Sequence, residues 1–160
     1  MKKRILFVCL GNICRSPAAE GILRDMAAKK CGGDDKLELE IDSAGTYGGH
    51  AGELPDERMR AAAAKHGYKL TSRSRRFTED DFARFDMIIT MDDAVYERVH
   101  RLAPSTGDAA KIYRMTDFCV ARKADHIPDP YYEGPRGFEH VLDLLEDCCG
   151  GLLATLKSNP

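Results

Sequence analysis

The chain has 160 residues, of which 43% are hydrophobic and 31% charged, and its formal net charge is −2. This length fits one domain, which we expect to span residues 1–160. The slightly negative charge argues against a nucleic-acid partner, because such proteins are usually strongly basic. No apolar run approaches the roughly 20 residues that a membrane helix needs. We therefore expect a cytoplasmic protein that contacts no membrane.

The six cysteines do not predict a disulfide scaffold. They are too scattered along a chain of this length, and none forms a C-x-x-C pair. The five histidines do not cluster with them at zinc-finger spacing, so no structural metal is expected. Most of the thiols are predicted to be small core residues.

The first half of the chain alternates strand and helix patterns. A run of branched and aromatic residues predicts a buried strand over residues 3–9. Helical spacing follows over residues 17–30, with Ser16 as N-cap and Pro17 in the first turn. The other predicted elements are a strand over 37–43, a glycine-rich loop over 46–54, a helix over 56–66 and a solvated basic turn over 71–76.

The second half continues the alternation and sets the fold class. The predicted elements are a strand over 86–90, a helix over 92–102, a strand over 111–115, a proline-containing loop over 124–137 and a helix over 138–156. Gly150 and Gly151 are expected to weaken the middle of the last helix. Strands that alternate with helices form a parallel sheet covered on both faces. The prediction is a single three-layer α/β domain.

The segment 9–17, Cys-Leu-Gly-Asn-Ile-Cys-Arg-Ser-Pro, joins the first strand to the first helix. Ligands bind at this edge of an open α/β sheet, where backbone N–H groups and the helix N-terminus attract anions. Cys9 begins the loop and Arg15 ends it, so a bound phosphate would be gripped by the guanidinium. The same field favours the Cys9 thiolate, an activated nucleophile. A Cys-x5-Arg pair alone is common and carries little weight. Here the pair lies between a predicted strand and a predicted helix, which makes it a much more specific sign of a catalytic phosphate site.

A general acid is needed as well, because a thiolate that attacks phosphorus expels an oxyanion. Such an acid typically contributes roughly 10²–10⁴-fold to the rate. Asp129 is the best candidate, since Pro128 and Pro130 restrict its backbone. From these residues alone, a plain Asp-Pro turn is the commoner explanation.

Three segments together resemble the low-molecular-weight protein tyrosine phosphatase family. They are residues 9–17, the stretch Asp-Ser-Ala-Gly-Thr at 42–46 and the stretch Asp-Pro-Tyr-Tyr at 129–132. They occur in the order and at the spacing of the family, over nearly the whole chain. The resemblance implies a four-stranded parallel sheet with the strand order 2-1-3-4.

The resemblance also implies a reaction, the hydrolysis of protein phosphotyrosine or small aryl phosphates through a phospho-cysteine. Cys9 would be the nucleophile and Arg15 the phosphate clamp. Asp129 would act first as general acid and then as general base for the attacking water. No cofactor is implied, because the N–H groups and Arg15 supply the positive charge.

Supporting residues follow from the same resemblance. Asn12, Ser16, Ser43 and His66 would form a hydrogen-bond network that shapes the loop, and Ser16 would also steady the leaving thiolate. For His66, a cation at a helix end is an equal alternative. Ser43 and His66 would have only this supporting role. The predicted substrate-binding residues are Leu10, Gly11, Asn12, Ile13, Cys14, Ser16, Tyr47, Tyr131 and Tyr132.

Cys14 and the residues around the cleft bear on regulation and specificity. Cys14 would trap an oxidised Cys9 as a disulfide, or else only pack within the loop. Tyr131 and Tyr132 would form an aromatic wall, or one of them would have a simple core or surface role. Ile13 favours phosphotyrosine, since relatives that hydrolyse phosphoarginine carry threonine at this position.

The chain departs from the family pattern at two positions. Gly49 stands where the family usually has an aromatic residue, so either one wall of the cleft would be missing or Tyr47 would supply it from a different angle. The sequence Met-Asp-Asp-Ala-Val at 91–95 lacks the asparagine of the family, and we expect Asp92 to be a helix N-cap rather than a substrate contact. Both departures affect peptide preference and leave the chemical groups in place.

Two other functions share these motifs. An arsenate reductase would need two further cysteines in a mobile segment, whereas Cys119 stands alone and Cys148 and Cys149 fall in a predicted helix. A non-catalytic phosphate-binding module would be expected to lack the nucleophile or the acid. We also expect a monomer, and we interpret the basic run 73–76 as a solvated face rather than a docking site.

Overall fold

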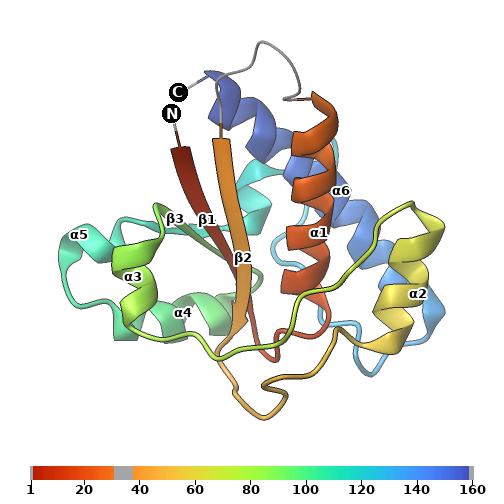
Figure 1. Cartoon of the computed structure of the whole chain (residues 1–160), viewed down its shortest axis with the longest axis horizontal. Helices are drawn as coiled ribbons and strands as arrows, with labels where there is room; N and C mark the ends of the chain where they lie inside the picture. The colour runs from red at the N-terminus through yellow and green to blue at the C-terminus, as the bar shows by residue number, and fades with distance from the viewer. Residues whose placement is uncertain (1, 31–37, 159–160) are drawn as a thin grey trace.

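The computed structural model describes residues 2–30 and 38–158. Four parallel strands form one sheet: β1 (Lys2–Cys9), β2 (Glu38–Gly45), β3 (Met87–Thr90) and β4 (Ile112–Arg114). Their order across the sheet is β2-β1-β3-β4 (Figure 1). Ile5 of β1 lies in register with Ile41 of β2 and Met87 of β3. The predicted parallel sheet of order 2-1-3-4 is therefore confirmed.

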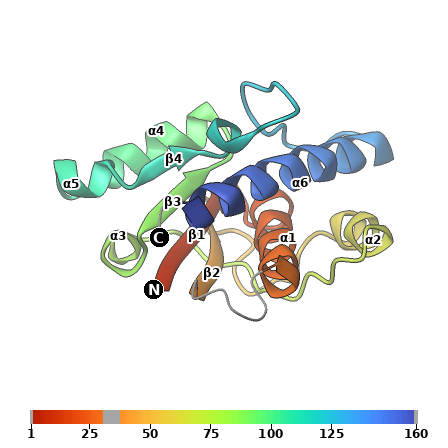
Figure 2. The same ribbon diagram turned by 90° about the horizontal axis from the view of Figure 1, so that it is seen from above.

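Helices cover both faces of the sheet (Figure 2). They are α1 (Arg15–Lys30), α2 (Glu57–Lys65), α3 (Asp80–Arg84), α4 (Asp93–Leu102), α5 (Thr106–Ala109), α6 (Pro135–Ser158) and the 3₁₀ turn η1 (Met115–Phe118). One layer contains α1 and α6, with α2 packed beside α6, and the opposite layer contains α3 and α4 (Figure 2). No helix in the described part of the chain is long and apolar enough to cross a membrane.

The apolar side chains of β1 pack against the helices on both faces of the sheet. Alternate side chains of a strand point to opposite faces of its sheet. Ile5 and Phe7 are fully buried in the cluster that includes α1 and α6, whereas Leu6 and Val8 are fully buried in the cluster that includes α3 and α4. Burial of each such side chain contributes about 1.5–3 kcal/mol. A strand covered on both faces is therefore continuously apolar, as its sequence indicated.

Several predicted boundaries differ from those of the structure. The first helix begins at Arg15, so the predicted N-cap and first turn, Ser16 and Pro17, lie inside it. The last helix begins at Pro135, inside the predicted loop 124–137, and proline suits a first helical position. The short elements α3, α5 and η1 were not predicted, because four or five residues show no clear periodicity. Leu37 and Cys31 lie outside the described residues.

The helix predicted over residues 138–156 is confirmed, whereas the expectation that Cys119 stands alone is wrong. Helix α6 continues through Gly150 and Gly151, and a Cβ on Gly151 would collide with the carbonyl oxygen of Phe118. Glycine here permits the close packing of η1 against α6. Cys119, which was expected to stand alone, forms a disulfide with Cys148 of α6.

Candidate active site

The loop between β1 and α1 is shaped for an anion. Its carbonyl groups accept hydrogen bonds from neighbouring segments: Cys9 O from Thr46 N at 3.0 Å, Leu10 O from Tyr47 N at 2.8 Å, and Ile13 O from Asp56 N at 2.7 Å. None of the hydrogen bonds among the described residues uses the N–H groups of residues 11–14. These donors remain available to a bound oxyanion next to the N-terminus of α1.

The nucleophile candidate is buried at the beginning of this loop. The sulfur of Cys9 lies 3.0 Å from the hydroxyl oxygen of Ser16. The same hydroxyl lies 3.4 Å from the carbonyl oxygen of Ala44. A thiolate can only accept a hydrogen bond, so an ionised Cys9 would take the hydrogen of Ser16. The structure thus brings Cys9 and Ser16 together as predicted.

Asn12 holds the middle of the loop in an unusual backbone conformation. Its φ angle is 57°, in the left-handed region, which costs an ordinary residue roughly 1–2 kcal/mol. Asparagine is among the residues that tolerate this region best. Its side chain is bonded at both ends, because Nδ2 donates to Ser16 Oγ at 2.8 Å and Oδ1 accepts from the backbone N–H of Arg75 at 2.9 Å.

Arg15 lies beneath the loop with only 3% of its side chain exposed. One guanidinium nitrogen donates to Asp92 Oδ2 at 2.6 Å and to the carbonyl oxygen of Ile127 at 3.0 Å, and the other lies 3.7 Å from Asp129 Oδ2. Burial by itself would lower the pKa of Arg15, but the charges of Cys9, Asp92 and Asp129 raise it overall. The arginine is therefore held charged and in place.

Asp92 has two roles in the structure. Its Oδ1 accepts a hydrogen bond from the backbone N–H of Val95 at 2.8 Å, so it is the N-cap of α4, as predicted. Its other oxygen binds Arg15. The second role was missed, because nothing in the sequence indicates that these two residues meet.

The candidate acid, Asp129, lies close to Arg15. The side chain of Asp129 is 41% exposed, and its Oδ1 accepts a hydrogen bond from the backbone N–H of Tyr131 at 3.1 Å. Asp129 therefore forms the local turn that the Asp-Pro pattern suggested. Its second oxygen faces Arg15, so the turn and the proposed acid are compatible.

These groups surround one cavity of about 280 Å³. It is lined by Cys9, Leu10, Gly11, Ile13, Cys14, Arg15, Tyr47, His50, Asp129, Tyr131 and Tyr132. Asn12 and Ser16 do not line it, and they support the loop from behind. His50 was not predicted. It is placed by a contact of 2.5 Å between its Nδ1 and Glu53 Oε2 and by edge-to-face packing with Tyr47.

Three tyrosines line the cavity: Tyr47, Tyr131 and Tyr132. Tyr131 and Tyr132 pack edge to face with ring centroids 4.9 Å apart, and the guanidinium of Arg58 lies 5.1 Å from the ring centre of Tyr131. A Cβ on Gly49 would collide with the ring of Tyr47. The departure from the family at position 49 thus leaves room for Tyr47.

Two predicted supporting residues lie outside the loop network. The ring nitrogens of His66 contact Glu146 at 2.8 Å and Glu139 at 2.6 Å, both on α6. His66 is the C-cap of α2, which fits the alternative of a helix-end cation. Ser43 donates its hydroxyl hydrogen to Glu20 at 2.5 Å instead of to Asn12 or Ser16. The expected four-residue network is therefore reduced to Asn12 and Ser16.

Cys14 lines the cavity as a buried thiol. Burial raises its pKa far above the usual range, and the charge of Asp56 adds to this effect. Cys14 is therefore a neutral thiol in the resting site. Whether it pairs with Cys9 on oxidation stays a prediction.

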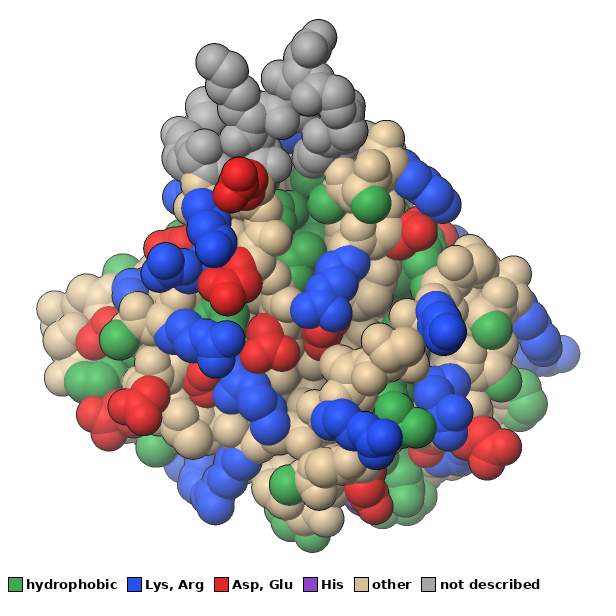
Figure 3. All heavy atoms as spheres, viewed as in Figure 1, with side chains coloured by type: hydrophobic (Ala, Val, Ile, Leu, Met, Phe, Trp, Pro, Cys, Tyr) green, Lys and Arg blue, Asp and Glu red, His purple; other side chains and the backbone are tan. Residues whose placement is uncertain are grey.

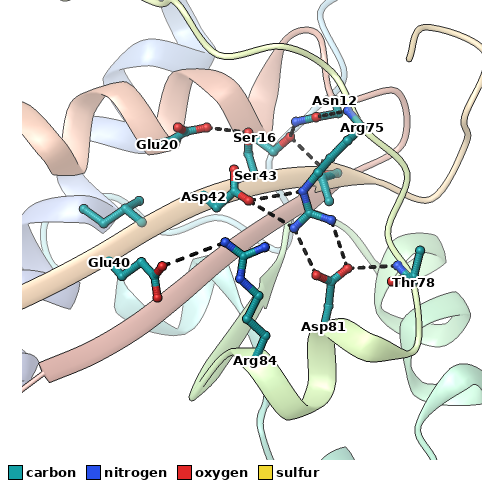
Figure 4. Close-up of polar contacts among 12 residues, drawn as sticks. Asn12, Ser16, Glu20, Glu40, Asp42, Ser43, Arg75, Thr78, Asp81 and Arg84 are labelled. Atoms are coloured by element: carbon teal, nitrogen blue, oxygen red, sulfur yellow. Dashed lines mark hydrogen bonds and ion pairs between the residues drawn. The ribbon is translucent and has the colours of Figure 1, made fainter. Parts of the chain in front are cut away.

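The basic run 73–76 is not a uniformly solvated face. Arg73 and Arg76 are exposed, but Ser74 is buried and Arg75 is bonded to two carboxylates (Figure 4). On the face seen in Figure 3, Lys and Arg side chains are mixed with Asp and Glu side chains. The expectation of a solvated turn is wrong for Ser74 and Arg75, because both contact the loop of residues 9–17, which we call the phosphate loop.

The fold and the site define a class of α/β proteins that bind phosphate with a loop between the first strand and the first helix. The family model for low molecular weight phosphotyrosine protein phosphatases matches residues 4–160. A low molecular weight protein-tyrosine-phosphatase of Streptomyces coelicolor is 43% identical over 159 residues, which are 98% of this chain and 95% of the relative. YfkJ of Bacillus subtilis, also described as a low molecular weight protein-tyrosine-phosphatase, is 40% identical over 156 residues, which are 96% of this chain and 95% of the relative.

A solved structure agrees with these relatives. The crystal structure of a protein tyrosine phosphatase from Entamoeba histolytica matches with a TM-score of 0.91 and 41% identity, covering 98% of this chain and 97% of that one. The chain therefore belongs to the low molecular weight phosphotyrosine protein phosphatase family, and its activity is that of a protein-tyrosine phosphatase.

Proposed function

We propose that the chain hydrolyses phosphotyrosine in proteins, with Cys9 as nucleophile, Arg15 as phosphate clamp and Asp129 as general acid and base. The observation that carries this assignment is the shared cavity, in which a buried Cys9 and Arg15 lie beneath an exposed carboxylate. The free N–H groups of residues 11–14 complete the site for a tetrahedral dianion.

In the first step, the Cys9 thiolate attacks phosphorus and forms the S–P bond. The bond between phosphorus and the tyrosine oxygen breaks, and protonated Asp129 donates its proton to that oxygen. Arg15 and the loop N–H groups bind the non-bridging oxygens throughout. Because Asp92 and Ile127 already hold the guanidinium, it needs little rearrangement during the reaction.

In the second step, water attacks the phosphorus of phospho-Cys9. Asp129, now a carboxylate, takes a proton from this water, the S–P bond breaks and inorganic phosphate leaves. The electron pair of the broken bond returns to the sulfur of Cys9. The Ser16 hydroxyl, 3.0 Å from this sulfur, donates a hydrogen bond to the developing thiolate.

The rings around the cavity support an aryl substrate. Tyr47, Tyr131 and Tyr132 all line the cavity, so a phosphotyrosyl ring would contact aromatic side chains. Ile13 adds an apolar surface near the base. A monomeric and cytoplasmic protein remains our prediction for the assembly and the compartment.

The test is phosphate release from phosphotyrosine, phosphoserine and phosphoarginine peptides without added metal ions. We expect turnover of the phosphotyrosine peptide alone, and its loss in Cys9→Ser. Asp125→Asn, a change at an exposed carboxylate in the same loop as Asp129, is the matched control and should be fully active. Full activity of Cys9→Ser would refute the nucleophile. Preference for another peptide would refute the substrate.

Arsenate reduction is the alternative activity, and it can be measured on the same protein preparation. It needs a relay of cysteines to the active site, whereas Cys148 is fully buried in α6 and neither Cys119 nor Cys148 lines the cavity. We therefore expect no thiol-dependent reduction of arsenate. Reduction without phosphotyrosine turnover would overturn the proposed function.

A further inference from the structure

We propose that Arg75 is a positioning residue for this reaction, because it fixes the orientation of the Asn12 amide and thereby directs the hydroxyl hydrogen of Ser16 towards Cys9. The inference rests on the proposed function for the role of Cys9. Figure 4 shows Arg75 with Asn12, Ser16, Asp42 and Asp81.

The guanidinium of Arg75 joins two elements of the fold. It donates to Asp42 Oδ2 of β2 at 3.1 Å, and it binds both carboxylate oxygens of Asp81 of α3 at 3.0 and 3.1 Å (Figure 4). The side chain of Asp81 is only 5% exposed, and its Oδ2 also accepts from the backbone N–H of Thr78 at 2.9 Å. Bidentate ion pairs of this type fix both partners in position.

The main chain around Arg75 follows the phosphate loop. The carbonyl oxygen of Arg75 accepts a hydrogen bond from Gly45 N at 2.9 Å, and its N–H donates to Asn12 Oδ1 at 2.9 Å. The neighbouring Ser74 hydroxyl donates to the carbonyl oxygen of Gly11 at 3.1 Å. The side-chain clamp therefore holds a backbone segment that contacts two consecutive residues of the loop.

The contact with Asn12 has a chemical consequence. An asparagine amide accepts at Oδ1 and donates at Nδ2, and a backbone N–H can only donate. The N–H of Arg75 must therefore face Oδ1, which turns Nδ2 towards Ser16. The observed bond from Nδ2 to Ser16 Oγ at 2.8 Å matches this orientation.

Ser16 in turn has one hydrogen to donate. Because its oxygen already accepts from Asn12, the hydrogen is left for Cys9 Sγ at 3.0 Å or for Ala44 O at 3.4 Å. If the amide of Asn12 turned over, its Oδ1 would accept this hydrogen and compete with the sulfur. Arg75 thus favours the arrangement in which the thiolate, rather than the amide, receives the hydrogen bond of Ser16.

The charge balance supports the clamp. Burial by itself would lower the pKa of Arg75, but Asp81 and Asp42 raise it overall, so the guanidinium stays charged. A neighbouring pair, Arg84 with Glu40, gives a contrast (Figure 4). Arg84 is 58% exposed, lies 3.8 Å from its partner and makes no contact with the phosphate loop.

The test compares Arg75→Met with Arg84→Met in the full chain. We expect Arg75→Met to lower kcat for a phosphotyrosine peptide about 10-fold, the effect of losing one hydrogen bond to a charged group. Arg84→Met should leave kcat unchanged. Arg75→Lys keeps the charge without the planar fork, so it should recover part of the loss.

A double-variant comparison separates positioning from mere structural support. If Arg75 acts through Ser16, Arg75→Met should cause no further fall in kcat in a Ser16→Ala background. An equal fall in both backgrounds, or an unchanged kcat in the single variant, would overturn the inference. If Arg75→Met folds poorly, Asp42→Asn tests the same route. It removes the charge of the more exposed partner of Arg75 and leaves Asp81 paired, so kcat should fall less, about threefold.

A spectroscopic measurement is independent of the chemistry. In Cys9→Ser protein, the side-chain NH₂ signals of Asn12 in a ¹H–¹⁵N NMR spectrum should shift on Arg75→Met and stay in place on Arg84→Met. Unmoved signals would overturn the positioning role even if Cys9 is the nucleophile. If the signals shift but Cys9→Ser is fully active, the proposed nucleophile is refuted. The contact between Arg75 and Asn12 would still be supported.

Discussion

The floor and the rim of the cavity are built differently. The floor, defined as Cys9 and Arg15, is buried and held by hydrogen bonds from several elements. The rim, defined as Tyr47, Asp129 and Tyr132, lies on irregular segments, and Tyr132 is 93% exposed. The floor can therefore hold a phosphate in one geometry, while the rim can adapt to the surroundings of the phosphotyrosine. Changes in the floor should act on kcat, and most changes in the rim should act on KM.

The largest effect is expected from Arg15→Met in the floor. It removes the charged fork that holds the phosphoryl oxygens in both steps, and kcat/KM should fall about 10³-fold. Steady-state kinetics with a phosphotyrosine peptide would measure this loss. Arg101→Met, at an exposed arginine of α4, is the control and should change nothing. A loss of less than about 10-fold would contradict the role of Arg15.

Asp129→Ala is the next largest change and the exception among rim residues, because the carboxylate takes part in both steps. We expect kcat for phosphotyrosine to fall about 10²-fold. The fall should be smaller for an aryl phosphate whose leaving group is more acidic than tyrosine, since that group needs less protonation. Comparison of the two substrates measures this difference. An equal fall for both would mean that Asp129 acts in some other way.

Tyr132→Ala should show the behaviour of an ordinary rim residue. Loss of one exposed aromatic contact should raise KM for a phosphotyrosine peptide roughly threefold to tenfold and leave kcat within twofold. Tyr132→Phe keeps the ring and should retain the original KM. A fall in kcat without a change in KM would place Tyr132 with the floor.

The smallest effect concerns stability away from the cavity. The pKa of His66 is raised by its hydrogen bond to Glu139 and, against the effect of burial, by Glu146. The folded state thus binds the proton more tightly than the unfolded state, whose histidine titrates near pH 6.5. The stabilisation is full below that pH and is lost as the pH rises through the higher folded pKa.

We therefore expect His66→Gln to lower the free energy of unfolding by about 1 kcal/mol at pH 6, and by less at alkaline pH. Chemical denaturation at both pH values measures the difference. His140→Gln, at an exposed histidine of α6, is the control and should leave the free energy of unfolding unchanged at pH 6. A loss that grows with pH would contradict the sign of the shift.

The sequence predicted the parts of the molecule that depend on neighbouring residues. The apolar run of β1 and the loop from Cys9 to Arg15 are continuous in the chain, so both could be identified, and the strand order followed from the family resemblance. The partners of Arg75 could not be predicted, because Asp42 is 33 residues away and α3 is too short to show helical periodicity. The basic run around Arg75 therefore looked solvated.

The same limit explains the errors on distant pairs. His66 contacts Glu139 and Glu146, which are 73 and 80 residues away, and no local pattern distinguishes these from other acidic residues. Cys119 and Cys148 are 29 residues apart and meet only because η1 packs against α6. Such contacts depend on how the layers assemble.

The central claim is the covalent intermediate on Cys9, and rapid acid quenching followed by peptide mass spectrometry tests it most directly. The native protein is mixed with a phosphotyrosine peptide, quenched during turnover and digested. We predict one added phosphoryl group on the peptide that contains Cys9, and none in Cys9→Ser. Continued turnover with the phosphoryl group on another residue, or with no phosphorylated enzyme at any time, would contradict the account.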